Sequence, residues 1–359
     1  LGGVLGALVS PALGGFLDRN GARAVLCFAV LLTGIPLLLL SFTQSLLYFF
    51  VFYCTARMAF SGPYDLGIHG SIVNWFVRRR AFATSVATLV TMSGLVSMPL
   101  IAHFVMQASD WRAAWVAIGA TVLVAGFVPT WALHLRRPED IGLRPDGERV
   151  TVSAGGGAGS AAEPDFSRGE ALRTPAFWLL SLFTLLVFPV QAGISLHQAP
   201  LLIERGLDPT AAAAAVSTFA LLSAVAGFAY GFWPRRVPLR FALALVGLTL
   251  TASCVLMANV QSAALAYGAA ALFGLGIGGL LTMLPIAWAD YFGRSSYGAI
   301  RGVALMVQVA GQALGPVLSG ALRDATGNYA ASLATFAVLA LAGSAAALFA
   351  APPGRQARG

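Results

Sequence analysis

The chain has 359 residues, of which 58% are hydrophobic and only 10% are charged. Because about a quarter of the residues in soluble domains are charged, this composition excludes a soluble globular protein and indicates a membrane protein. All 22 basic residues are arginines, and the lack of lysine excludes a Walker-type phosphate loop, and with it an ATP-driven pump, on this chain. The net charge of +8 does not indicate nucleic acid, because the arginines lie in short loops between apolar runs.

Apolar runs of roughly 20 residues, long enough to cross a bilayer core of about 30 Å, follow one another along the chain. They are too long for barrel strands and show no alternation, so we expect each to be a helix. Five runs come first, at residues up to 17, 24–43, 46–73, 82–107 and 111–135. Six follow a polar stretch, at residues 175–196, 210–232, 239–259, 262–288, 298–321 and 330–350. Within the polar stretch, the Gly/Ser/Ala-rich residues 153–162 are typical of a flexible linker.

Two polar hinges between apolar runs share one spacing. Residues 14–23, GGFLDRNGAR, return 217 positions later as residues 231–240, GFWPRRVPLR. A repeat of this length that holds several apolar spans is typical of secondary transporters. The repeat predicts four parts, namely an N-terminal bundle at 1–135, a linker at 136–173, a C-terminal bundle at 174–351 and a tail at 352–359. The repeat partner of the span at 175 would fall before residue 1, so we expect eleven of twelve helices here, with the first helix absent.

The arginines are unevenly distributed among the loops. Eighteen of the 22 lie in one set of alternate loops and in the tail, whereas the opposite loops hold only three. Loops rich in Arg and Lys face the cytoplasm. We therefore expect a multi-pass protein of the cell inner or plasma membrane, with both hinges, the linker and the C-terminus on the cytoplasmic side.

The first hinge resembles a known motif. It resembles G-x-L-x-D-R-x-G-x-R, found between the second and third helices of the major facilitator superfamily, with Gly14 or Gly15, Asp18, Arg19, Gly21 and Arg23 in place. The stretches NWFVRRRAFATS, DWRAAW, RRPEDIGLRPDG and TPAFW are similar to the branch that holds monocarboxylate and oxalate/formate carriers. The resemblance implies an all-α membrane protein with the major facilitator fold, in which two pseudo-symmetric helical bundles move one small solute by alternating access.

The resemblance also implies a cytoplasmic gate at the hinges. In the family the hinge aspartate, here Asp18, joins charge contacts that close the cytoplasmic side, and the positive start of a neighbouring helix is a suitable partner. The alternative is a solvated loop acid. Arg235 stands where the second copy would have its aspartate, so we expect an asymmetric gate. The expected gate residues are Gly14, Asp18, Arg19, Gly21, Arg23, Arg236 and Arg240.

Arg57 is the one arginine expected near the middle of a span. An arginine at that depth is costly and usually faces a polar cavity, so Arg57 is the candidate for holding a carboxylate, with Tyr64 as a further substrate-binding candidate. The alternative for Arg57 is an internal salt bridge or a clamp on backbone carbonyls. Asp65 and His69 lie one turn apart and are candidates for carrying a coupled proton. Their alternative roles are an acid that satisfies Arg57 or a neighbouring helix, and a histidine bonded to a carbonyl.

Neutral polar side chains supply further candidates in the second half. The candidates for hydrogen bonds to substrate are Gln191, Thr282, Gln308 and Gln312, and the last two share a helix face. Single polar residues in membrane helices more often join helix to helix, which is the alternative for all four. Oxalate carriers use basic side chains in this half, whereas here the span at 210–232 carries no charge and the span at 298–321 carries only Arg301, near its start. The resemblance therefore favours a monoanion over a dianion.

We predict a secondary active transporter of a small organic anion, monocarboxylate-like, either proton-coupled or exchanging. The expected partners are the solute, protons and the lipid bilayer, with no nucleic acid, and the chain is expected to be a monomer. No cofactor and no metal are expected, because the sequence lacks HExxH and GxSxG and its GxGxxG run at 274–279 lies inside an apolar segment. The alternatives are a multidrug/proton antiporter of the same superfamily and a non-transporting membrane sensor. An enzyme would need a nucleophile or metal cluster that the sequence does not offer.

Overall fold

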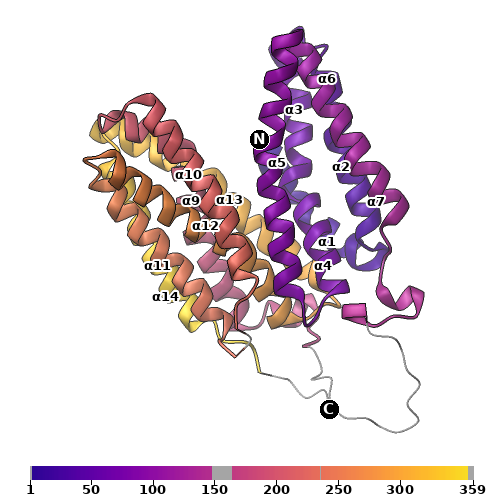
Figure 1. Ribbon diagram of the computed structural model, residues 1–359. Helices are drawn as coiled ribbons and strands as arrows, with labels where there is room; N and C mark the ends of the chain where they lie inside the picture. Colours follow the sequence, from indigo (N-terminus) through magenta and orange to yellow (C-terminus); the bar gives the residue numbers. More distant parts are fainter. Residues whose placement is uncertain (1, 148–163, 235, 355–359) are drawn as a thin grey trace. The chain divides into compact units, whose positions relative to one another are not determined.

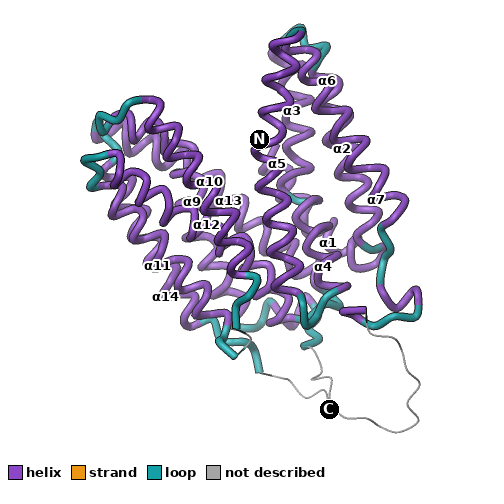
Figure 2. The backbone as a smooth tube through the Cα atoms, in the orientation of Figure 1, coloured by secondary structure: helices purple, strands orange, loops and turns teal. Residues whose placement is uncertain are grey.

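The computed structural model describes residues 2–147, 164–234 and 236–354, and all regular structure in these ranges is helical (Figure 1, Figure 2). Arg235, the Gly/Ser/Ala-rich residues 153–162 and residues 355–359 of the tail lie outside the described residues. The chain divides into two compact units, each assembled from more than one segment of the sequence.

Unit 1 comprises Leu1–Arg80, Ser93–Ala171 and Phe292–Met306. Its helices from the first part of the chain are α1 (Gly2–Asn20), α2 (Ala22–Leu40), α3 (Leu46–Ser61), α4 (Pro63–Trp75), α6 (Trp111–Val122) and α7 (Val128–Leu133), with most of α5 (Arg80–Ala108). A π-helical segment, η1 (Leu123–Phe127), joins α6 to α7. Short helical turns η2 (Pro138–Ile141), η3 (Pro145–Gly147) and α8 (Arg168–Ala171) follow.

Unit 2 comprises Ala81–Met92, Leu172–Tyr291 and Val307–Gly359. Its helices are α9 (Pro175–Glu204), α10 (Pro209–Tyr230), α11 (Leu239–Ala258), α12 (Ala263–Phe292), α14 (Ala330–Phe349) and the larger part of α13 (Tyr297–Thr326). Helices α5 and α13 each contribute to both units. The division into an N-terminal and a C-terminal bundle, which the repeat predicts, stays a prediction.

Nine helices of the described residues are long and apolar enough to cross a membrane. They are α2, α5, α6 continued into α7, and α9 to α14. The two remaining expected spans are also helical, as α1 and as the pair α3 and α4. The expectation of an all-helical, multi-pass membrane fold is thus confirmed.

Side chains at the helix starts explain where two of these helices begin. Asp110 accepts the backbone N–H of Ala113 at 2.8 Å and caps α6, and Thr174 accepts that of Phe177 at 3.2 Å and caps α9. Pro175 occupies the first position of α9, where its fixed φ favours the helix and its missing N–H costs nothing. The stretches DWRAAW and TPAFW are therefore helix starts.

The expected single span at 46–73 is interrupted. Gly62 has φ −143° and ψ −70°, so α3 ends and α4 begins there with Pro63 at its first position. Proline has no N–H and its ring clashes with the carbonyl four residues earlier, which breaks a continuous helix. The break lies against α1, because a Cβ added to Gly62 would lie 2.6 Å from the hydroxyl of Ser10.

Small residues on α1 allow close helix packing within unit 1. A Cβ added to Gly6 would lie 2.5 Å from the carbonyl oxygen of Met58 on α3, and one added to Gly14 would clash with the carbonyl of Gly298 on α13. Contacts of this kind let two helix backbones approach in a bilayer, where apolar burial gives no driving force for association. Helix α1 therefore packs closely on both α3 and the first turn of α13.

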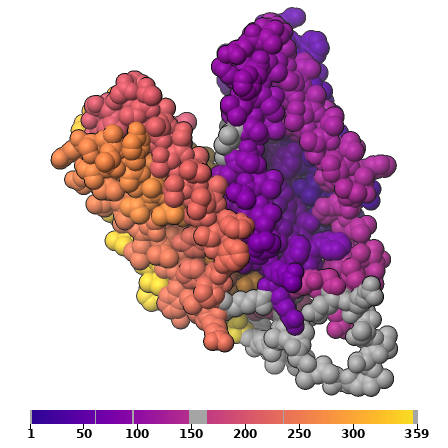
Figure 3. All heavy atoms as spheres, viewed as in Figure 1, coloured from indigo at the N-terminus to yellow at the C-terminus, as the bar shows by residue number. Residues whose placement is uncertain are grey.

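In unit 2 the GxGxxG run of α12 packs against α10. A Cβ added to Gly274 would lie 2.5 Å from the carbonyl oxygen of Phe219, and one added to Gly278 would clash with that of Ser223. The outer faces of the helices in both units carry many large exposed apolar side chains, such as Phe104. Figure 3 shows one face of the molecule with all its atoms. Exposed apolar surface of this extent suits contact with lipid.

Candidate functional site

Asp18 at the first hinge holds the start of α13. Its two carboxylate oxygens accept the backbone N–H groups of Gly298 and Ala299, each at 2.8 Å. These groups lie in the first turn of α13, where backbone N–H groups have no partner within the helix and the helix dipole favours an anion. Burial raises the pKa of Asp18 to about 6, against the opposing effect of the two N–H bonds and of Arg137. Asp18 therefore contacts a helix start and is not a solvated loop acid.

The other expected gate residues lie in the first hinge, near the Asp18 contact, or in the second hinge, in unit 2. Gly21 joins α1 to α2 at φ 83°, a left-handed conformation that favours glycine. The carbonyl of Arg19 accepts a hydrogen bond from Arg136, and the guanidinium of Arg23 lies 5.8 Å from the ring centre of Trp131.

In the second copy of the hinge, Arg236 is exposed and the guanidinium of Arg240 lies 5.0 Å from the ring centre of Phe241. A carboxylate at position 235 would have been the counterpart of Asp18, but Arg235 lies outside the described residues. Whether the gate is asymmetric stays a prediction.

Residues 136–147, which follow α7, form a strap over the same end of unit 1. Asp146 accepts the backbone N–H groups of Val77 at 3.2 Å, Arg78 at 2.7 Å and Arg79 at 3.0 Å, directly before α5 begins. Asp146 itself has φ 63°, an uncommon conformation for a residue with a side chain. One carboxylate from the predicted linker therefore holds the three residues directly before α5.

The strap has two further attachments. Arg137 donates to the carbonyl of Asp18 at 3.4 Å, and Glu139 forms an ion pair with Arg294 at 2.8 Å. Arg294 lies three residues before α13 and also donates to the carbonyl of Asn74 at 3.5 Å. The strap thus joins the ends of α1, α4 and the segment leading into α13.

Asp65 on α4 pairs with Arg301 on α13. The Nη2 atom of Arg301 lies 3.2 Å from Oδ1 and 3.3 Å from Oδ2 of Asp65, and the Arg301 side chain is only 1% exposed. His69 lies one turn further along α4, and its Nδ1 atom is buried with no hydrogen-bond partner in the part of the chain that the structure describes. The sequence leaves two possible partners for Asp65, Arg57 or a neighbouring helix. The geometry favours the neighbouring helix, α13. Its role in carrying a proton stays a prediction.

Arg57 is exposed on α3, with its guanidinium 4.9 Å from the ring centre of Phe60. Tyr53 and Phe60 are exposed on the same helix, one turn before and after Arg57. The guanidinium is accessible, as a binding group must be. Its role in holding a carboxylate stays a prediction.

Two candidates serve helix packing in this structure. Tyr64 packs against the core cluster of unit 1 that includes Leu17 and Leu66. Thr282 is fully buried and donates to the carbonyl of Gly227 at 3.1 Å, with the hydroxyl of Thr88 at 3.3 Å. The alternative role of joining helices describes both residues as they lie here.

The glutamine candidates lie on α9 and α13 within unit 2. The Nε2 atom of Gln312 donates to Oε1 of Gln191 at 3.5 Å, the outer limit of a hydrogen bond. Gln308 lies one turn before Gln312 and is 8% exposed. Both residues of the contact are partly exposed, and their contact with substrate stays a prediction.

Gln198 and His197 are not among the candidates that the sequence offers. Gln198 is fully buried on α9, and neither atom of its amide has a partner among the described residues. It follows Gln191 by seven residues, almost two helical turns, so helical spacing could have placed it on the same face. His197 contacts Tyr329 and Pro316, and no local sequence pattern indicates those partners.

Comparison with known proteins gives three kinds of match. The family model described as Major Facilitator Superfamily matches residues 1–308 and also residues 192–359. Monocarboxylate transporter 11 of Mus musculus is 27% identical over 350 residues, covering 93% of this chain and 74% of that protein. Monocarboxylate transporter 13 of Bos taurus is 28% identical over 345 residues, covering 93% and 75%. The crystal structure of the human organic anion transporter MFSD10 matches with a TM-score of 0.73 at 16% identity, covering 96% and 82%, which shows a likeness of fold alone.

Proposed function

The chain belongs to the major facilitator superfamily, and on this premise we propose that it is a secondary active transporter of a small organic monoanion, such as a monocarboxylate. The relatives named monocarboxylate transporters match over nearly the whole chain, which supports this class of solute. The observation that carries the proposal is the exposed side chain of Arg57 on the apolar helix α3, about one turn before the break at Gly62. An arginine within a membrane span usually faces a polar cavity, where it can bind an anion.

Arg57 in unit 1 binds the carboxylate of the solute in this proposal. The amides of Gln191, Gln308 and Gln312 in unit 2 are separate candidates for hydrogen bonds to a solute. One guanidinium matches one carboxylate in charge, so the proposed solute is a monoanion. Neutral amides add hydrogen bonds without a second charge to be balanced.

The proposed coupling is to protons or to a counter-solute. His69 carries the proton in the first case, because its buried Nδ1 lies one turn from the ion pair of Asp65 with Arg301. The gate is the Asp18 contact with α13, which parts when the protein opens on the side of the linker. We place the linker and C-terminus in the cytoplasm and the protein, as a monomer, in a cell inner or plasma membrane.

The decisive variant is Arg57→Ala. We expect the KM for pyruvate to rise by about 10- to 100-fold, because a hydrogen bond to a charged group contributes roughly 1.5–3 kcal/mol. The measurement is counterflow of radiolabelled pyruvate in proteoliposomes that contain the purified protein, with folded protein quantified by size-exclusion chromatography.

Arg112→Ala is a matched control, because Arg112 also lies over an aromatic ring, that of Trp111 at 4.3 Å, but at the start of a helix. The control should transport normally. Unchanged uptake by Arg57→Ala would remove Arg57 from the site. Competition by hydrophobic cations would favour the multidrug antiporter, and binding without counterflow would favour the sensor.

A further inference from the structure

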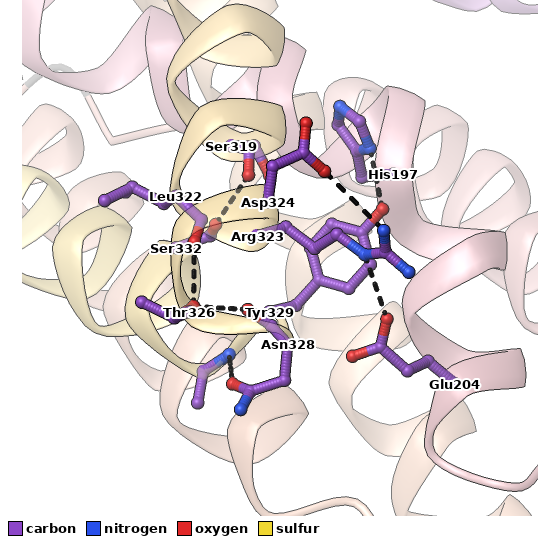
Figure 4. Close-up of polar contacts among 11 residues, drawn as sticks. His197, Glu204, Ser319, Leu322, Arg323, Asp324, Thr326, Asn328, Tyr329 and Ser332 are labelled. Atoms are coloured by element: carbon purple, nitrogen blue, oxygen red, sulfur yellow. Dashed lines mark hydrogen bonds and ion pairs between the residues drawn. The ribbon is translucent and has the colours of Figure 1, made fainter.

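Helices α9 and α13 meet along a seam of polar contacts in unit 2. Along this seam Gln191 meets Gln312, His197 meets Pro316 and Glu204 meets Arg323. The two residues of each contact are 121, 119 and 119 positions apart in the sequence. Because this separation is almost constant, the two helices run side by side along the seam. The candidate amides therefore lie at one end of a seam whose other end is the polar cluster in Figure 4.

Pro316 leaves a weak point in α13 next to the candidate amides. Proline has no N–H, so the backbone carbonyl of Gln312, four residues earlier, loses its usual partner in the helix. A helix bends readily at such a position. The backbone of α13 alone therefore does not fix the direction of the turn that carries Gln308 and Gln312.

His197 holds this weak point from α9. A carbonyl oxygen can only accept, so the ring Nε2 of His197 donates to the carbonyl of Pro316 at 3.3 Å. In the neutral ring the other nitrogen, Nδ1, is then an acceptor, and it takes the hydroxyl proton of Tyr329 at 3.1 Å. Both ring nitrogens are thus engaged, which fixes the tautomer and the direction of the imidazole.

Surrounding contacts hold Tyr329 and the outer part of α13 in place (Figure 4). Tyr329 is 7% exposed at the start of α14, and its ring lies 5.9 Å from the guanidinium of Arg323. Arg323 is paired with Glu204 at 3.4 Å. In addition, Ser332 donates to the carbonyl of Ser319 at 2.9 Å, which ties α14 to α13 beyond the proline. His197 therefore stands between a rigid support and a flexible turn.

We infer that His197 is a positioning residue that, through the carbonyl of Pro316, sets the direction of the α13 turn carrying Gln308 and Gln312. The inference rests on the proposed function, because those amides are the proposed contacts to the solute. His197 touches no solute itself, but it positions the two proposed solute-binding amides.

The first test is hydrogen–deuterium exchange in the full chain without solute. His197→Ala should increase exchange of peptides covering 311–320 by about tenfold, since the lost hydrogen bonds stabilise the turn by up to about that factor. His197→Gln should restore protection, because its amide can both donate to a carbonyl and accept from a hydroxyl. Exchange equal to wild type in His197→Ala would overturn the inference.

The second test is pyruvate counterflow with the same variants. His197→Ala should raise the KM by about tenfold with little change in the maximal rate per folded protein, and His197→Gln should return the KM to within about threefold of wild type. Thr249→Ala on α11 is the control, because among the described residues its hydroxyl bonds only to the carbonyl of Leu245 in the same helix, and it should leave the KM unchanged. A loss of rate with unchanged KM in His197→Ala would overturn the positioning role.

The two tests separate the inference from the proposed function. If wild-type protein does not move pyruvate, the proposed function fails, while the exchange result still supports or overturns the hold of His197 on α13. If Gln312→Ala transports pyruvate with a normal KM, the Gln312 amide is not a contact to the solute. In that case an increase of exchange in His197→Ala would show only that His197 shapes α13.

Discussion

Gln198 on α9 is fully buried, yet neither the oxygen nor the nitrogen of its amide has a partner among the described residues. Leaving a buried donor or acceptor unpaired costs about 1–3 kcal/mol, so an apolar side chain of similar size would be more favourable in this position. Unsatisfied polar groups in native proteins are concentrated where function requires them.

Gln198→Leu should therefore raise the stability of the folded protein. We expect a gain of about 1–2 kcal/mol, seen as a melting temperature several degrees above wild type, because the unpaired amide is removed at nearly constant volume. Thermal unfolding in detergent measures it. Thr184→Val on the same helix is the control, since the Thr184 hydroxyl is already bonded to the carbonyl of Leu180 at 2.7 Å and its loss should bring no gain. A melting temperature of Gln198→Leu at or below wild type would show that the amide is satisfied.

Among the elements, the strap at 136–147 is the first part of the predicted linker. Its Asp146 carboxylate accepts three successive backbone N–H groups directly before α5, and Arg79, the residue before α5, makes no side-chain cap. A side chain from 67 residues away thus fixes the segment that leads into α5. The start of α5 depends on the strap staying in place.

Asp146→Ala should loosen the start of α5. Hydrogen bonds from backbone N–H groups to a carboxylate stabilise a helix start, and loss of a cap costs about 0.5–2 kcal/mol. We expect faster hydrogen–deuterium exchange in peptides covering 77–84, while peptides of α11 stay as in wild type. Asp140→Ala in the same strap is the control, because its side chain is exposed. Equal protection in both variants would contradict the capping role.

The sequence predicts the helices well because their signals are local. Apolar length and polar punctuation indicate all eleven helical segments, and Gly62 with Pro63 indicates the interruption between α3 and α4. The site is harder to predict, because its pairs form between distant segments. Asp65 and Arg301 are 236 residues apart, and the sequence offers Arg57 as an equally plausible partner. Only the packing of α13 against α4 distinguishes the two arginines.

At the scale of the whole molecule, unit 1 contains segments from both halves of the chain, and several polar contacts bind them together, of which two involve helix α13 itself. These two contacts are the ion pair of Asp65 with Arg301 and the contact of Asp18 with the start of α13. Breaking a buried ion pair by removing one partner costs about 3–5 kcal/mol, so such a pair favours the joined state. The Asp18 contact adds a dependence on pH that the ion pair does not require.

The pH dependence follows from the pKa of Asp18. In the contact this pKa is about 6, whereas the ordinary value of 3.8 applies once the carboxyl is solvated. Between these values the joined state binds a proton that the separated or unfolded state does not, so acid favours the contact. The stabilisation is complete below about pH 4 and is lost as the pH rises through about 6. Mild acid on the side of the hinge should therefore keep α1 and α13 together.

Asp18→Asn tests this linkage, because its amide is neutral at every pH and can still accept one N–H. The melting temperature of wild type should fall relative to Asp18→Asn as the pH is raised from 4 to 6.5, and the difference should then stay level. Asp208→Asn should show the opposite dependence of stability on pH. Asp208 caps α10, and its bonds to Thr210 lower its pKa below the ordinary value, so wild type should gain stability over that variant as the pH rises toward that ordinary value. A constant difference between wild type and Asp18→Asn would mean that Asp18 keeps its ordinary acidity in the contact, and the gate would then respond to solute alone.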